Sequence, residues 1–138
     1  DGLLDVLLSE WIQPTLGIDR PLIVRNYPLS QAALARTAED DPRCASRFEL
    51  FAAGIELANG YDELTDADIL EKRLRENSVK RQTSGRKAIA GPDEGLIRKI
   101  SEELPRCTGV ALGVDRLLMV RTGKRSIREV LPFPIDLA

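Results

Sequence analysis

Apolar residues near the start of the chain recur at helical spacing until Pro14 ends the pattern. The positions are Leu3, Leu4, Leu7, Leu8 and Trp11. They predict an amphipathic helix that packs on a core. Pro21 to Pro28 then predicts a short strand bounded by prolines, and residues 47–64 predict two strands.

Three further helices are predicted after these strands. Thr65, before an acidic first turn, is the expected N-cap of a helix that ends near Gly85. Asp93 caps a shorter helix, and a last one of about ten residues runs toward Gly123. In the shorter helix, the inward positions are Leu96, Ile97 and Ile100. The basic run from Lys72 to Lys87 predicts a solvated face, with nucleic-acid contact as the alternative.

Composition restricts the chemistry that this chain can perform. The 138 residues are 43% hydrophobic and carry a formal net charge of -2, which fits one modest domain without a general basic field. No apolar run reaches the roughly 18 residues of a membrane span, so we expect a cytoplasmic protein with no membrane partner. Cys44 and Cys107 are expected to be buried or half-buried thiols. The absence of histidine excludes Ser-His and Cys-His nucleophile pairs.

Two glutamates lie on the predicted hairpin. If Ala53 and Gly54 form a two-residue turn, then Glu49 and Glu56 are diagonal neighbours on one face, roughly 7–8 Å apart at the backbone. That spacing is within reach of one divalent ion. The alternative is an exposed sheet face that carries two unrelated glutamates.

Three polar residues downstream share one strand parity, opposite to that of Glu56. They are Asn59, Tyr61 and Glu63. A bulge near Asn59 and Gly60 would bring them to the face of the glutamate pair. Such a pocket would suit a small cationic substrate.

The segment from Gly109 to Met119 predicts a strand that leads into a helix. Its glycines would let the backbone approach a ligand, and Arg116 would direct one fixed cation at phosphate. The alternative is a strand-to-helix turn with a surface salt bridge.

The runs FELFAAGIELANGYDELTDA and GVALGVDRLLM resemble the closing part of class II aminoacyl-tRNA synthetases of the lysyl type. The second run, residues 109–119, is similar to their third signature motif. Within that group, NYPLSQAALA and EDDPR resemble the ligases that attach (R)-β-lysine to elongation factor P. Ala111 stands where lysyl-tRNA synthetases generally have glycine. The resemblance implies an α+β fold, the C-terminal portion of the class II antiparallel sheet flanked by helices.

The resemblance also implies a role for each site residue, with ATP and Mg²⁺ as cofactors. Glu49, Leu50, Gly113 and Arg116 would bind ATP, and Glu49 and Glu56 would hold the metal. Glu56, Asn59, Tyr61, Glu63 and Ala111 would bind the lysine-like amino acid, with Glu63 on its distal ammonium. Arg116 and Glu49 would be the catalytic residues, because adenylate formation needs positioned charge and no protein nucleophile.

The first and second motifs of the class are not found, so residues 1–138 are expected to be part of a catalytic domain. The parent would be a ligase acting on a lysine of elongation factor P, with tRNA not expected as acceptor. The piece alone would be inactive and would form a homo-oligomer. One alternative is a C-terminal piece of a lysyl-tRNA synthetase. The other is a truncated, non-catalytic paralogue that acts as a binding module.

Overall fold

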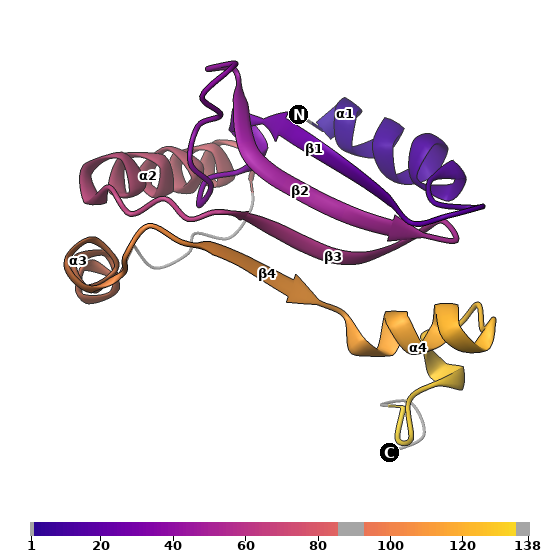
Figure 1. The fold of residues 1–138 in the computed structure, drawn as a ribbon. Coiled ribbons are helices and arrows are strands. Elements are labelled where there is room, and N and C mark those ends of the chain that lie inside the picture. Colours follow the sequence, from indigo (N-terminus) through magenta and orange to yellow (C-terminus); the bar gives the residue numbers. More distant parts are fainter. Residues whose placement is uncertain (1, 86–92, 135–138) are drawn as a thin grey trace. The chain divides into compact units, whose positions relative to one another are not determined.

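The computed structural model describes residues 2–85 and 93–134, and these residues form an α+β fold (Figure 1). Four strands make one antiparallel sheet in the order β1-β2-β3-β4. The strands are β1 Leu22–Pro28, β2 Cys44–Ala52, β3 Ile55–Asp62 and β4 Thr108–Leu112. The α-helices of the described ranges are α1 Gly2–Val6, α2 Ala67–Thr83, α3 Glu94–Glu103 and α4 Val114–Thr122. No helix in these ranges is long and apolar enough to cross a bilayer. The fold class expected from the resemblance is confirmed.

The chain divides into two compact units. The first unit comprises Asp1–Arg25, Phe48–Gly60 and Val110–Ala138, and it contains the β2–β3 turn and α4. The second comprises Asn26–Arg47 and Tyr61–Gly109, and it contains α2 and α3.

The β2–β3 turn of the first unit has the predicted two residues. Ala53 and Gly54 have φ values of 52° and 75°, so both adopt the left-handed conformation of a type I′ turn. The turn is held by a preceding segment, since the amide of Ala53 donates to the carbonyl of Gly17 at 2.7 Å and that of Gly54 to Leu16 at 2.9 Å. The turn length places Glu49 opposite Ala58, and therefore diagonal to Glu56, as predicted.

The register between β3 and β4 is set by two backbone hydrogen bonds. The amide of Gly113 donates to Leu57 at 2.8 Å, and the amide of Glu63 donates to Cys107 at 3.0 Å. Both strands advance by six residues between these bonds, so β3 carries no net extra residue there. The bulge considered at Asn59 and Gly60 is therefore not found, and the register places Asn59 opposite Ala111. The condition under which Asn59, Tyr61 and Glu63 would join the face of the glutamate pair is thus not met.

The N-terminal apolar pattern does form a helical segment. It continues from α1 through a π-helical turn, Leu7–Ile12, and a 3-10 turn, Gln13–Thr15. The prediction that it packs on a core is wrong for the described residues, because Leu3 is 75% exposed and Trp11 is 74% exposed. Periodicity identifies an apolar face, but it does not supply an element to cover that face.

The second unit has two small cores. One consists of Ala32, Ala35 and Ala45 with Leu29 and Tyr61 against them, and the other of Leu64, Leu70 and Ile97 with Ala67, Leu74 and Ile100. The two cysteines, which lie in this unit, are half-buried free thiols as expected. Of the α3 positions predicted to face inward, Ile97 is buried and Ile100 packs on the second core. Leu96 is 56% exposed, so that prediction is wrong, because on an α-helix Leu96 lies about 100° around the axis from buried Ile97.

The helix boundaries follow capping carboxylates. Asp66 caps α2 by accepting from the amide of Ile69 at 3.0 Å, and Asp93 caps α3 by accepting from Leu96 at 3.0 Å. The prediction for Asp93 is confirmed. The N-cap of α2 lies one residue later than predicted, because the Thr65 hydroxyl instead accepts from Arg36 at 3.4 Å. Helix α2 ends at Thr83, near the predicted end, and Lys87 lies outside the described residues.

Candidate functional site

The structure brings together two of the predicted site residues in the first unit. Arg116, in the first turn of α4, donates from Nη1 to the backbone carbonyl of Glu56 at 3.0 Å. The same nitrogen lies 3.3 Å from Oε2 of the Glu56 carboxylate. The Arg116 side chain is 48% exposed, so the guanidinium is anchored on β3 and remains accessible to a ligand.

Gly113 has a structural reason to be glycine. A Cβ at this position would lie 3.3 Å from Cδ of Arg116 and 3.5 Å from its Cβ and Cγ. The absence of a side chain therefore leaves room for Arg116 to fold back toward Glu56. The amide of Gly113 also fixes the start of α4 through its bond to Leu57.

Glu49 is the charged residue that is buried within residues 2–85 and 93–134, with 7% exposure. This contradicts the alternative in which both glutamates lie on an exposed face. A buried carboxylate is costly unless other groups compensate its charge, and Glu49 does take part in polar or electrostatic interactions. Its neighbour Leu50 is half-buried.

The side chains of Glu49, Glu56 and Arg116 are suited to binding magnesium and a phosphate ester. The two glutamates offer hard oxygen ligands, and the planar guanidinium of Arg116 matches phosphate oxygens. Among the described residues, no cluster of three or more His, Cys, Asp or Glu side chains could form an all-protein metal site. Magnesium needs no such cluster when it is held by one or two carboxylates together with substrate phosphates.

The predicted substrate residues fall in both units. In the first, Asn59 is half-buried and faces exposed Ala111 across the β3–β4 ladder. In the second, Tyr61 packs against the alanine core. Burial raises the pKa of the Tyr61 phenol, and the negative charge of Glu63 raises it further, so the phenol stays neutral at physiological pH.

Glu63 follows β3 and is held on both sides. It forms an antiparallel bridge with Ala35 on one side and donates its amide to Cys107 on the other. Its carboxylate lies against Gly109, where a Cβ would meet Oε1. Sequence reasoning assigned Gly109 only to ligand approach, and it missed this contact. The signal was the glycine that opens the third motif.

The family comparison covers nearly the whole chain. The class II tRNA synthetases (D, K and N) match residues 14–137. Proteins named elongation factor P--(R)-beta-lysine ligase are 44% identical over 139 residues in two strains of Klebsiella pneumoniae. One from Salmonella gallinarum is 41% identical over 140 residues. Each alignment covers 100% of this chain and 42% of the relative, so the chain spans less than half the length of these curated relatives. The hairpin, the strand-to-helix turn at Gly113 and this match together show that the chain belongs to the class II tRNA synthetases of the D, K and N group.

Proposed function

We propose that the protein containing this chain activates a lysine-like amino acid, (R)-β-lysine, with ATP and transfers it to a lysine of elongation factor P. The names of three relatives, at 41–44% identity across the chain, support this substrate and acceptor. The observation that carries the proposal is the anchoring of Arg116 on Glu56, the diagonal cross-strand neighbour of buried Glu49.

The proposed reaction has two steps. A carboxylate oxygen of the amino acid attacks the α-phosphorus of ATP, and pyrophosphate leaves. The lysine amine of the acceptor then attacks the acyl carbon, AMP leaves, and an amide forms with release of a proton. Neither step needs a side-chain nucleophile, which agrees with a chain that contains no histidine.

Each residue has a positioning role in this proposal. Arg116 keeps one guanidinium edge on the Glu56 carbonyl and offers its other N–H groups to the terminal phosphate. Glu49 and Glu56 would hold Mg²⁺, which when bound neutralises phosphate charge. Gly113 and Leu50 would contact the bound nucleotide. As the resemblance implies, Asn59 would orient the amino-acid carboxylate, Ala111 and Tyr61 would contact the amino acid, and Glu63 would pair with its distal ammonium.

Amino-acid-dependent exchange of pyrophosphate into ATP tests the proposal with the full-length protein encoded by the gene. We expect faster exchange with (R)-β-lysine than with α-lysine, and transfer of the β-lysyl group to elongation factor P. Preference for α-lysine together with aminoacylation of tRNA would instead identify a lysyl-tRNA synthetase. Binding without any exchange would identify a non-catalytic paralogue.

A further inference from the structure

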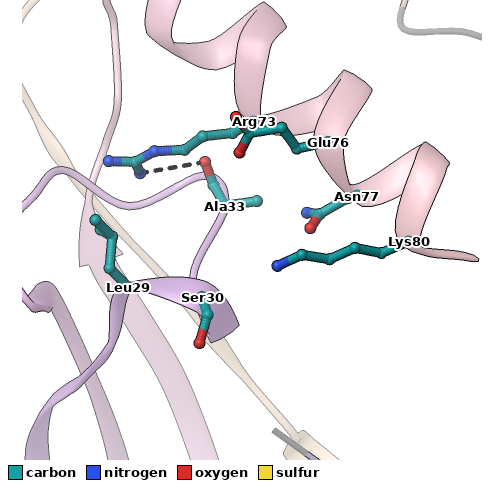
Figure 2. A pocket seen from close by; sticks show the side chains of 7 residues that line it. All are labelled: Leu29, Ser30, Ala33, Arg73, Glu76, Asn77 and Lys80. Atoms are coloured by element: carbon teal, nitrogen blue, oxygen red, sulfur yellow. Dashed lines mark hydrogen bonds between the residues drawn. The ribbon is translucent and has the colours of Figure 1, made fainter.

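Arg73, on α2, is attached to a neighbouring loop by its guanidinium. Nη1 donates to the carbonyl of Ala35 at 2.6 Å and lies 3.5 Å from the carbonyls of Ala32 and Ala33, and Nη2 donates to the Thr37 hydroxyl at 3.0 Å. Figure 2 shows the side chain reaching from the helix to the Ala33 carbonyl. Burial lowers the pKa of Arg73, but arginine still keeps its charge at any physiological pH. One charged residue of α2 therefore binds three carbonyls and one hydroxyl of the loop segment 32–37.

The cavity beside this contact has a different character. It encloses about 220 Å³ between α2 and the loop, and its lining residues are Leu29, Ser30, Ala33, Arg73, Glu76, Asn77 and Lys80 (Figure 2). The guanidinium of Arg73 is committed to backbone carbonyls, and the Glu76 and Lys80 side chains are exposed. The contacts of Arg73 therefore indicate a structural link and not a ligand site.

The segment that Arg73 holds is paired directly with Glu63. Ala35 and Glu63 form an isolated antiparallel bridge. On either side of it, the backbone amide of Arg36 donates to the Asp62 carbonyl at 2.8 Å and the backbone amide of Leu64 donates to the Leu34 carbonyl at 3.0 Å. The backbone of Glu63 is thus placed by the same short segment whose carbonyls bind Arg73.

This pairing is short and depends on its support. Segment 34–37 belongs to no regular strand. Its other described contacts include the bridge from Thr37 to Ala45, the bond from the Ser46 amide to the Arg36 carbonyl at 2.8 Å and the ion pair of Arg36 with Asp62 at 3.4 Å. Without the guanidinium, the carbonyls of Ala32, Ala33 and Ala35 lose their common donor. The support of Glu63 on this side would then weaken while its amide bond to Cys107 remains, and its carboxylate would shift relative to Gly109.

We propose that Arg73 is a positioning residue for Glu63, acting through segment 32–37 to fix the carboxylate that selects a cationic amino acid. The inference rests on the proposed function, in which Glu63 binds the distal ammonium. Its consequence is that a residue outside the substrate pocket controls affinity for the amino acid and not for ATP.

The test replaces Arg73 with methionine and uses Arg75→Met as the matched control. Arg75 lies on the same helix, is 61% exposed, and pairs with Glu71 one turn away, with Nε at 2.9 Å from the carboxylate. Pyrophosphate exchange by the full-length protein gives separate KM values for (R)-β-lysine and ATP. We expect Arg73→Met to raise the KM for the amino acid by about tenfold or more, within the roughly 100-fold cost of a small displacement of a positioned group. The KM for ATP, and both values in Arg75→Met, should stay unchanged.

A double-mutant cycle separates positioning from general damage. Glu63→Gln should raise the KM for the amino acid, and adding Arg73→Met to it should have little further effect, since the carboxylate being positioned is gone. Thr37→Val removes a single acceptor and should produce a smaller rise in the same KM, which keeps the inference testable if Arg73→Met fails to fold.

The outcomes distinguish the inference from the proposed function. Equal changes in both KM values, additive effects in the cycle, or an unchanged amino-acid KM in a folded Arg73→Met or Thr37→Val variant would overturn the positioning role alone. An unmodified protein that exchanges no pyrophosphate, or a Glu63→Gln variant with unchanged affinity for the amino acid, would overturn the role proposed for Glu63, and the inference would fall with it.

Discussion

Gly17 supports the hairpin that carries both predicted metal ligands, and Gly17→Ala should therefore be strongly destabilising. The residue has φ of 68°, and a Cβ there would lie 2.5 Å from the Phe51 carbonyl oxygen and 2.8 Å from Cα of Ala52. Both are backbone atoms of β2, so the clash cannot be relieved by a side-chain rotation. The turn and the segment before β1 would have to separate.

The structure sets the size of the effect. A left-handed conformation costs a non-glycine residue roughly 1–2 kcal/mol. Separation would weaken the two hydrogen bonds that the turn amides of Ala53 and Gly54 donate to Gly17 and Leu16, each worth about 0.5–1.5 kcal/mol. We expect Gly17→Ala to reduce the free energy of unfolding by about 2–5 kcal/mol.

Gly123 provides the matched control, because its φ is 69° and nothing lies within 4 Å of an added Cβ. Gly123→Ala should cost only the conformational part, about 1–2 kcal/mol. Urea denaturation followed by circular dichroism measures both variants. Equal losses in the two would show that the contact between Gly17 and β2 contributes nothing, and would refute the reasoning.

Three other substitutions test the site and its surroundings. Arg116→Lys removes the planar donor anchored on Glu56 and should slow pyrophosphate exchange by on the order of 100-fold, and an unchanged rate would exclude Arg116 from phosphate binding. Ala111→Gly should shift the ratio of exchange rates toward α-lysine by about tenfold or more, and an unchanged ratio would exclude this position from substrate selection. Arg43 donates hydrogen bonds to Asp41 and lowers the pKa of that carboxyl from 3.8 to about 2. The contribution of this pair to the stability of the fold is therefore complete above pH 3.8 and is lost as pH falls toward about 2. Asp41→Asn should flatten this part of the acid dependence of the urea midpoint, and parallel curves for variant and parent would contradict the assignment.

The local signals of the hairpin favoured a two-residue turn, with a longer loop in another register as the alternative because Ala53 is not ideal in such a turn. A small residue followed by glycine between two alternating runs predicted the two-residue turn, and Ala53 and Gly54 both have positive φ. The start of α2 was predicted to within one residue. Thr65 and Asp66 can both cap a helix, and the observed hydrogen bonds show that Asp66 is the cap. Turn and cap chemistry depends on a few consecutive residues, and a sequence shows those directly.

Burial depends on partners that local patterns do not identify. Leu3 and Leu96 occupy apolar positions of correctly predicted helices, yet both are exposed. Glu49 was compatible with an exposed face from its spacing alone, and it is buried. The expected homo-oligomer, which would cover apolar surface, stays a prediction.

Contacts in the candidate site join residues far apart in the chain. The guanidinium of Arg116 reaches a strand residue 60 positions earlier, and the Glu63 carboxylate lies against Gly109. Only the resemblance to class II synthetases connected these segments in advance. The ligand roles of Asn59 and Tyr61 stay predictions.

The basic run on α2 shows most clearly what composition leaves open. Arg73 and Arg75 are two positions apart, which on a helix with 3.6 residues per turn separates them by about 200°. A charge count treats them alike, and the run was predicted to be a solvated face. Arg75 fits that prediction, whereas Arg73 bonds to the carbonyls of the segment that pairs with Glu63. The two residues are both arginines on the same helix, but they have different contacts. Arg75→Met therefore removes a charge alone, whereas Arg73→Met removes the same charge and the contacts that position the loop.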